Sequence, residues 1–258
     1  MAIQTKKMSE WLSQNGEAVT NASKASMQAY LERNLRPLQD GVYVGKIQND
    51  GWGNQTGGET ANIGSYMRIE PWQTTGIGIS SGDADAIVIQ HGGYRLGIAL
   101  TEPSNAMKWG SVQNSNSVGY KTSRDLNTFD GSTRTAGIMA SSYYKNDDPA
   151  TYGVAYCWNY MTNRTEGSKI CQIGKHNWWL PTTGDLALIH QHFETINLAL
   201  QRIKNAGKQP VSLLQRTYYW SCVEYSGNYA WGLLFSYGRR LNGGKIGYNY
   251  RVRPVTAF

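Results

Sequence analysis

The clearest pattern of apolar positions lies between residues 184 and 205. Apolar residues there step by three and four positions, which places them on one face of an amphipathic helix: Leu186, Ile189, Phe193, Ile196, Leu200 and Ile203. Thr182 and Asp185 have the spacing of a capping box, with Asp in the place of the usual Glu. Gly207 and Pro210 are typical residues for the end of such a helix. The pattern therefore predicts one helix over 184–205.

Two apolar runs earlier in the chain predict a β-hairpin. Residues 86–90 and 94–100 are apolar, and His91-Gly92-Gly93 between them has the composition of a tight turn. Residues 41–83 are rich in Gly, Asn, Gln and Thr and contain shorter β-type runs at 42–47, 66–69 and 76–79. We expect a small β module that precedes the hairpin.

The remaining stretches carry weaker patterns. Residues 8–36 repeat apolar residues near helical spacing up to Pro37, which predicts a broken helix. Helices of this kind often pack against a copy of themselves, which is consistent with oligomerisation. Residues 103–148 are polar and predict loops, and residues 150–161 predict a short helix. After residue 205, short aromatic runs alternate with Gly, Asn and Ser turns. This mixture of helices and strands predicts an α+β fold.

Composition and charge narrow the picture. The chain has 258 residues, which fits one large domain or two modest ones. Only 17% of the residues are charged, and Gly, Tyr and Trp are plentiful, as in loop-rich β folds. Residues 202–258 hold nine Lys and Arg against one acid, Glu224, whereas residues 1–201 hold sixteen against seventeen acids. A basic region can attract nucleic acid or acidic glycans. No nucleic-acid motif accompanies it, so we favour an incidental charge on a binding surface and expect no nucleic-acid partner.

The three cysteines are too few for a disulfide framework. Cys157 and Cys171 could form a disulfide in an oxidising compartment, and Cys222 would then be unpaired. For Cys157 and Cys171 we prefer the interpretation that both are free, buried thiols. Residues 1–8 lack the apolar core of a signal peptide. No apolar run approaches the ~20 residues of a membrane span. We therefore expect synthesis in the cytoplasm and no membrane insertion.

Enzyme signatures are weak. Neither a Ser nucleophile motif nor HExxH occurs in the sequence. Asp83 with Asp85, or Asp147 with Asp148, could join a calcium site, although exposed loop acids are the favoured interpretation. We expect no catalytic activity, no metal and no cofactor.

Several fragments of the second half resemble one family. Trp179-Leu180-Pro181-Thr182 followed by Asp185-Leu186 is similar to that family's helix entry, and the runs of the hairpin resemble its opening strands. Further matching positions follow in register: Tyr219-Trp220-Ser221, Glu224-Tyr225-Ser226, Ala230-Trp231, Phe235, Gly238, Lys245 and Val252-Arg253-Pro254-Val255. Residues 84–258 thus resemble the C-type-lectin-fold variable proteins of phage and bacterial diversity-generating retroelements, whose fold is shared distantly with formylglycine-generating enzyme.

The resemblance implies a fold and a domain organisation. It implies an α+β, C-type-lectin-like domain over 84–258 with short twisted antiparallel strands, two helices and long loops. A small helical and β region over 1–83 would precede it and serve assembly or attachment. The enzyme's cysteine chemistry cannot be placed on any cysteine of this chain, so the resemblance does not imply its activity.

A codon argument supports the variable-protein interpretation. These retroelements mutate adenines in a template, and an Asn codon AAC changed at both adenines cannot encode Lys, Gln, Glu, Met or Trp. Across residues 217–251 the residues outside its reach are Trp220, Glu224, Trp231 and Lys245, all at positions that match the family's fixed scaffold. Every residue between them can be reached, which favours a variable segment over about 217–251.

The expected ligand-binding residues lie in this segment. They are Cys222, Val223, Gly227, Asn228, Tyr229, Gly232, Leu234, Tyr237, Arg239, Arg240, Leu241, Asn242, Gly244, Ile246, Tyr248, Asn249 and Tyr250. Their Tyr, Gly and Asn content matches antibody paratopes, in which Tyr supplies rigid amphipathic area at low entropy cost. Arg239, Arg240 and Arg251 are expected to pair with carboxylates or sulfates on a target.

Fixed residues are expected beneath that surface. Trp220 and Trp231 should pack below the binding surface, and Glu224 is expected to pair with Arg253 within the scaffold.

The resemblance also implies partners and a setting. It implies a receptor-binding protein of a phage tail fibre that contacts a protein or glycan on a target cell, with a homotrimer as the expected assembly and the virion or the host exterior after lysis as the location. A bacterial adhesin or lectin-like protein without a retroelement is the first alternative. An enzyme on the formylglycine-generating-enzyme-like fold is the second.

Overall fold

The computed structural model describes residues 39–48, 66–73, 83–112, 129–166 and 169–257. The chain divides into two compact units, Met1–Gln39 and Asp40–Phe258. All the described helices and strands belong to the second unit, and Gln39 is the one described residue of the first. The expected helix over 8–36 and the expected strand over 76–79 lie outside the described residues. Within the described part of the chain, no helix has the length and apolar character needed to cross a membrane.

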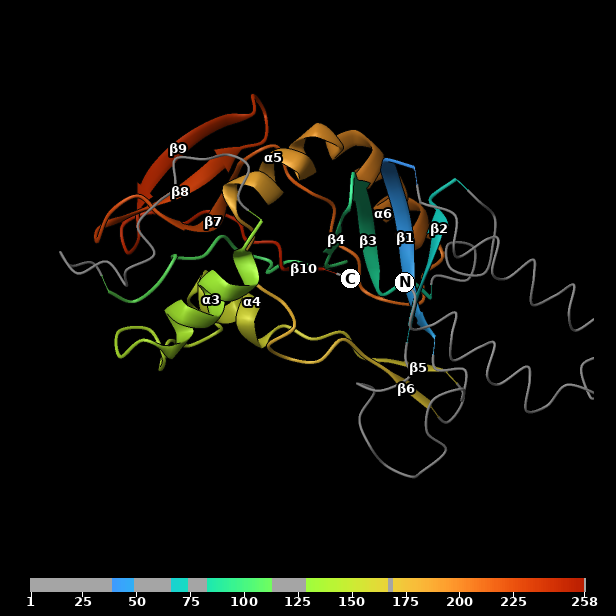
Figure 1. The fold of residues 1–258 in the computed structure, drawn as a ribbon, viewed down its shortest axis with the longest axis horizontal. Helices are drawn as coiled ribbons and strands as arrows, with labels where there is room; N and C mark the ends of the chain where they lie inside the picture. Colours follow the sequence, from blue (N-terminus) through green and yellow to red (C-terminus); the bar gives the residue numbers. More distant parts are fainter. Residues whose placement is uncertain (1–38, 49–65, 74–82, 113–128, 167–168, 258) are drawn as a thin grey trace, which may run out of the picture. The chain divides into compact units, whose positions relative to one another are not determined.

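The second unit is an α+β fold with antiparallel sheets (Figure 1). Its helices are α3 Gly131–Ala140, α4 Gly153–Asn159, α5 Thr183–Gln191 and α6 Phe193–Asn205. Its strands are β1 Gly41–Gln48, β2 Tyr66–Pro71, β3 Ala86–His91, β4 Tyr94–Ile98, β5 Arg164–Glu166, β6 Lys169–Cys171, β7 Tyr218–Glu224, β8 Tyr229–Leu234, β9 Arg239–Gly244 and β10 Val255–Ala257.

A five-stranded sheet forms one side of this unit. Its strand order is β10-β4-β3-β1-β2, with every neighbouring pair antiparallel. The expected hairpin is confirmed as β3 and β4, and the expected runs 42–47 and 66–69 are confirmed within β1 and β2. Because β1 pairs directly with β3, the boundary expected at residue 83 falls inside this sheet, and the compact unit begins at Asp40 instead.

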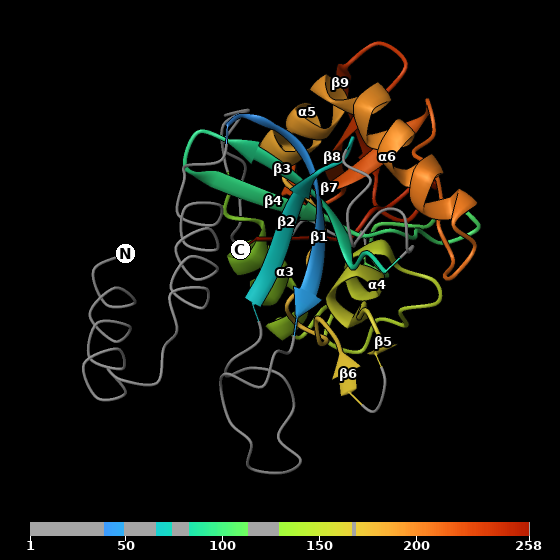
Figure 2. The same cartoon turned by 90° about the vertical axis from the view of Figure 1, so that its right-hand side faces the viewer.

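Helices α5 and α6 connect the two larger sheets. Helix α6 packs on β1 and β3 of the five-stranded sheet (Figure 2), and α5 packs on β7 and β8 of a three-stranded sheet with the order β7-β8-β9. The capping box of Thr182 and Asp185 is confirmed, with both of its hydrogen bonds present. The predicted single helix is wrong in one respect, because His192 has non-helical backbone angles and separates α5 from α6. The predicted apolar stripe is nevertheless buried along its whole length.

Helix α3 contradicts the prediction of loops over 103–148. Its sequence, rich in Gly, Ser and Thr, has low helix propensity. Tertiary packing stabilises the helix: Ile138 and Met139 are buried, and a Cβ on Gly131 would lie 2.5 Å from Trp179 Cδ1. Helix α4 confirms the prediction over 150–161.

Two hydrophobic cores flank the three-stranded sheet. The first core lies between the five-stranded sheet and the helices α5 and α6, and it extends to Tyr219, Leu233 and Phe235 of the β7–β8 region. The second core joins α3, α4 and the other residues of β7, and it includes Trp109, Ile138, Val154, Leu180, Trp220, Cys222, Val223, Tyr250 and Val252. Strand β7 therefore contributes to both cores, Tyr219 to the first and Trp220, Cys222 and Val223 to the second, and its register is irregular between Trp220 and Glu224.

Candidate ligand-binding surface

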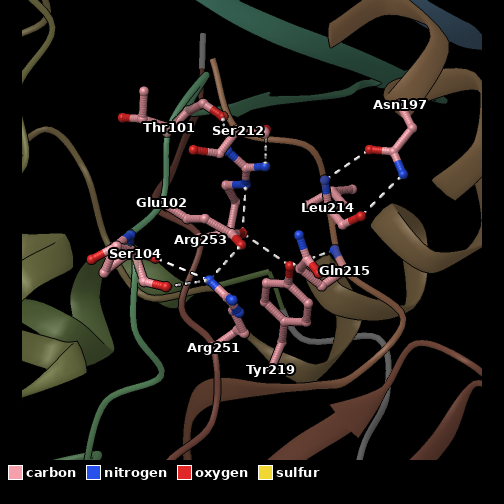
Figure 3. A network of polar contacts seen from close by, with 12 residues as sticks. Thr101, Glu102, Ser104, Asn197, Ser212, Leu214, Gln215, Tyr219, Arg251 and Arg253 are labelled. Carbon is pink, nitrogen blue, oxygen red and sulfur yellow. Dashed lines mark hydrogen bonds and ion pairs between the residues drawn. The ribbon is translucent and has the colours of Figure 1, made fainter. Parts of the chain in front are cut away.

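A buried polar network attaches the chain's last residues to the body of the protein (Figure 3). The Glu102 carboxylate accepts hydrogen bonds from Tyr219 Oη at 2.9 Å and from Arg251 Nη1 at 3.2 Å, and Arg253 Nε lies 3.4 Å from it. Arg253 also donates to the carbonyl oxygens of Ala99 and Ser212. The expected pairing of Arg253 with Glu224 is therefore wrong, because Arg253 lies against Glu102.

Glu224 pairs instead with Lys245, and both side chains are completely buried in the second core. Lys245 Nζ also lies 3.2 Å from Tyr144 Oη and 4.6 Å from the centroid of the Trp109 ring. Burial lowers the pKa of Lys245 because it disfavours the ammonium, and the Glu224 carboxylate acts in the opposite direction. The pair links β7 to the end of β9 beneath the sheet.

An aromatic cluster fills the inner face of the three-stranded sheet. Tyr250 lies 4.1 Å from the Trp220 ring and 4.8 Å from Tyr218, measured between ring centroids. A Cβ added to Gly243 would lie 2.7 Å from Trp220 Cη2 and 2.9 Å from Tyr250 Oη. A Cβ on Gly232 would lie 2.7 Å from the Tyr219 carbonyl oxygen. Glycine is thus required at both positions by close packing.

The other face of the same sheet, called the outer face below, is partly covered by the first core, which includes Leu233, and its uncovered part carries a partly exposed row of side chains. The strand register places Tyr229 and Trp231 of β8 on one face with Arg240 and Asn242 of β9. The Arg240 guanidinium lies 4.6 Å from the centroid of the Trp231 ring, an arrangement that favours a cation–π contact. Tyr225 packs edge-on against Trp231 at 4.9 Å. Tyr229 and Asn242 are exposed, and Trp231 and Arg240 are half-buried.

The turn after β9 adds a second exposed group beside this row. Tyr248 is 55% exposed, and Ile246 and Asn249 are exposed as well. The Tyr248 ring lies 3.6 Å from the position of a Cβ on Gly244, and Gly244 is directly opposite Tyr229 in the ladder. Tyr229 and Tyr248 therefore both border Gly244.

The opposite end of the β8–β9 hairpin presents a third group. Tyr237 is 83% exposed in the turn, and Arg239 at the start of β9 is exposed. Gly238 has a φ of +64°, and a Cβ there would lie 2.8 Å from His190 Cε1, so this turn is held against α5. Leu234 and Leu241 are half-buried and lie on the same face as Arg239, opposite to Tyr229.

Some of the expected ligand-binding residues are internal. Cys222, Val223, Gly232, Gly244 and Tyr250 are buried. Cys222 and Val223 lie in the second core at the irregular part of β7, and Tyr250 packs against Trp220. Buried positions can also hold residues that an AAC codon reaches, so the codon argument alone does not identify the exposed positions. Gly227 and Asn228 are half-buried in the β7–β8 turn.

Two further expectations need correction. Arg251 is not available to a target as expected, because it donates to Glu102 and to the Pro103 and Ser104 carbonyl oxygens. Tyr225 is 42% exposed and lies beside Trp231 in the row on the outer face. It is not among the expected ligand-binding residues, because it was assigned to the fixed positions of the resemblance. Its position in a Gly- and Ser-containing turn was the available signal.

The acidic pairs considered for calcium have structural partners. Asp85 is buried and accepts from Ile47 N at 2.7 Å and Arg164 Nη2 at 3.0 Å, and burial raises its pKa. Asp147 is also buried and accepts from Ser111 N at 3.0 Å, so the interpretation as exposed loop acids is wrong for both. No group of three or more His, Cys, Asp and Glu within the described ranges has a geometry suited to a metal ion.

The two described thiols are deep in the second core. Cys157 and Cys222 are free and completely buried, and burial raises the pKa of each well above that of an ordinary thiol. A raised pKa lowers the thiolate population that a nucleophile requires.

Comparison with known proteins gives one distant similarity. No protein-family model matches the chain, and no significant match is found among curated proteins. The chain is similar to the crystal structure of a fimbrial protein from Bacteroides ovatus ATCC 8483, with 14% sequence identity and a TM-score of 0.41. The similarity covers 84% of this chain and 43% of the other, so this chain spans less than half the length of that protein. At this identity and TM-score the similarity assigns no function.

Proposed function

We propose that this chain is a non-enzymatic binding protein with a C-type-lectin-like, diversified C-terminal domain. Its binding surface would be formed by the exposed residues of β8, β9 and the adjoining turns. The observation that carries this proposal is a division within residues 217–251. Four residues of this segment cannot be encoded by an AAC codon mutated at its adenines. Of these, Trp220, Glu224 and Lys245 are completely buried, and Trp231 is half-buried. The exposed positions all hold residues that such a codon can reach.

The division has a physical basis. A side chain in contact with solvent can be exchanged at a cost usually within about 0.5 kcal/mol, whereas a buried ion pair or tryptophan cannot. The polar network of Glu102 and the buried Glu224–Lys245 pair would therefore hold the sheet while exposed side chains vary. Tyr229, Tyr237 and Tyr248 supply the rigid amphipathic area on which paratopes rely.

The proposal includes a biological setting. The chain would act as the receptor-binding tip of a phage tail fibre, outside the cell that made it, and bind a protein or glycan on a target cell. Assembly into a trimer would add the contributions of several weak sites. Binding requires no cofactor and no chemical step.

A library experiment tests the proposal directly. A library with NNC codons at the exposed positions Tyr229, Asn242 and Tyr248 would be displayed on yeast, beside a matched library at the buried positions Trp220, Val223 and Glu224. We expect most clones of the first library to remain resistant to protease and most of the second to lose resistance. Selection of the first library on unrelated target proteins should yield specific binders. Equal loss of resistance in both libraries would refute a diversifiable surface.

The gene neighbourhood separates the proposal from an adhesin without a retroelement. We expect a near-copy of the segment that encodes 217–258 beside a reverse transcriptase gene, with differences concentrated at adenines. A genome that lacks both would favour the adhesin.

A further inference from the structure

One end of the three-stranded sheet presents exposed aromatic rings together with exposed amides. Tyr225, Tyr229 and Tyr248 are 42%, 40% and 55% exposed, and Asn242 and Asn249 are exposed as well. These residues belong to β8, β9, the β7–β8 turn and the turn after β9. The five of them form what we call the tyrosine patch.

Packing against the sheet holds the rings of the tyrosine patch in place. The Tyr225 ring lies edge-on against Trp231, with 4.9 Å between the ring centroids and an interplanar angle of 81°. The Tyr248 ring lies 3.6 Å from the position of a Cβ on Gly244, so it packs over the residue that pairs with Tyr229 across the ladder. Rings that are already held lose little conformational entropy when a ligand binds.

The tyrosine patch carries no charged side chain of its own. Across residues 225–231 and 241–249 the one charged residue in the sequence is Lys245, whose side chain is completely buried. The Arg240 guanidinium on the same face is half-buried and lies over the Trp231 ring. A ligand complementary to this patch is therefore uncharged.

The side chains of the patch suit the two kinds of surface on a neutral sugar. The face of a tyrosine ring carries a partial negative charge, which favours contact with the polarised C–H groups on one face of a sugar ring. The amides of Asn242 and Asn249 each offer donors and an acceptor, which match hydroxyl groups that also donate and accept. Binding sites for small molecules combine aromatic area with a few polar groups in the same way.

We infer that the tyrosine patch binds a neutral polysaccharide, with Tyr229 and Tyr248 against sugar rings and Asn242 on hydroxyl groups. The inference rests on the proposed function and specifies the class of its ligand. A repeating polymer lets several copies of the chain bind at once, which compensates for the low affinity of a small site.

A protein ligand fits the tyrosine patch less well because the patch is small. Specific protein interfaces bury about 800 Å² and roughly 20–30 residues on each partner. Residues 225–231 and 241–249 contain seven exposed residues, which are Tyr225, Tyr229, Asn242, Ile246, Gly247, Tyr248 and Asn249. This number is far below that of a protein interface but is sufficient to contact a few sugar rings.

A glycan array probed with the full chain tests the inference. The array carries neutral glycans built from hexoses, deoxyhexoses and N-acetylhexosamines, together with sialylated, uronic and sulfated glycans. The affinity for the neutral glycan with the strongest signal is then measured in low and in high salt. The variants are Tyr229→Ala and Tyr248→Ala, with Tyr143→Ala as the matched control, because Tyr143 is 37% exposed in the turn after α3. Circular dichroism on each variant verifies that the fold is retained.

We expect the wild-type chain to bind neutral glycans and to bind the acidic ones no more strongly. Each variant of the patch should bind about tenfold more weakly, because the contact of a ring with a sugar is lost, and Tyr143→Ala should match the wild type. High salt should leave the affinity unchanged, because no ion pair contributes to it.

Three results would overturn the inference. They are the absence of binding to every neutral glycan, a strong decline of binding in high salt, or an equal loss of affinity in Tyr143→Ala. A blank array together with enrichment of apolar sequences from a random peptide library would indicate a protein ligand instead. The yeast-display library is independent of ligand class, so its success together with any of these results rejects the polysaccharide and retains the proposed function.

Discussion

Lys245 lies against Glu224 in the second core, and neither side chain is exposed to solvent. Transfer of two charges from water into a protein interior is costly, and their mutual attraction offsets that cost only while both are present. The pair joins β7 to the end of β9, and the Trp109 ring lies 4.6 Å from the ammonium. The candidate surface is thus built over an ion pair from which neither partner can be removed alone without leaving the other charge buried and uncompensated.

Loss of the cation should destabilise the fold strongly. In Lys245→Met the Glu224 carboxylate would remain buried without its partner, and we expect a decrease of about 3–5 kcal/mol in the free energy of unfolding. Urea denaturation followed by tryptophan fluorescence measures it. The double variant Lys245→Met with Glu224→Gln leaves no buried charge and should recover part of the loss. A single variant that costs less than about 1 kcal/mol would contradict the role assigned to the pair.

The two glycines Gly243 and Gly247 should differ in their tolerance of a methyl group. A Cβ on Gly243 would lie 2.7 Å from Trp220 Cη2, whereas a Cβ on Gly247 would have no neighbour within 4 Å. We expect Gly243→Ala to cost about 1–3 kcal/mol through overpacking and Gly247→Ala to change stability by less than about 0.5 kcal/mol. Thermal denaturation of the two variants tests this. Similar melting temperatures would show that Trp220 and Tyr250 can move aside.

Asp185 should make stability depend on pH. Burial raises its pKa from 3.8 to about 6, against the lowering effect of its hydrogen bonds with Thr182 and Tyr94. The folded state therefore holds this proton more tightly than the unfolded state does. The contribution is fully present below about pH 4 and is lost as the pH rises through about 6, on the order of 3 kcal/mol in all.

The variant Asp185→Asn isolates this effect. Its side-chain oxygen can still accept from the Thr182 N–H, but it cannot ionise. Urea titrations between pH 4 and pH 7 should show a smaller decline in stability for the variant than for the wild type. Parallel curves would mean that Asp185 does not titrate in this range.

Local periodicity predicted a large part of this fold. The hairpin of β3 and β4, the capping box and the apolar stripe of α5 and α6 follow from patterns of two, three and four residues, and each is present. The break at His192 divides the helix into α5 and α6, and the apolar stripe remains buried on both sides of it. Helix α3 could not be predicted, because Gly131 and its Ser and Thr neighbours become helical only through packing against Trp179. The pairing of β1 with β3 is likewise a nonlocal contact.

The composition of the candidate site was predicted better than its geometry. Exposed Tyr229, Tyr237 and Tyr248 were expected, and so was the burial of Trp220. The partners of the buried charges could not be predicted, because sequence spacing does not reveal that Arg253 pairs with Glu102, which lies far upstream in the chain. A sequence pattern also cannot reveal that Tyr250 faces Trp220 while Tyr248, two residues away, is exposed.

Three tyrosines should separate the binding surface from its support. Tyr248 and Tyr229 are 55% and 40% exposed, whereas Tyr250 is 9% exposed and packs between Tyr218 and Trp220. We expect Tyr248→Ala and Tyr229→Ala to leave the free energy of unfolding within about 0.5 kcal/mol of the wild type, and Tyr250→Ala to lower it by about 3–5 kcal/mol. Urea denaturation gives the three values under one condition. A loss above about 2 kcal/mol in the Tyr229 or Tyr248 variant would mean that these rings support the fold, and they would then have to be removed from the candidate surface.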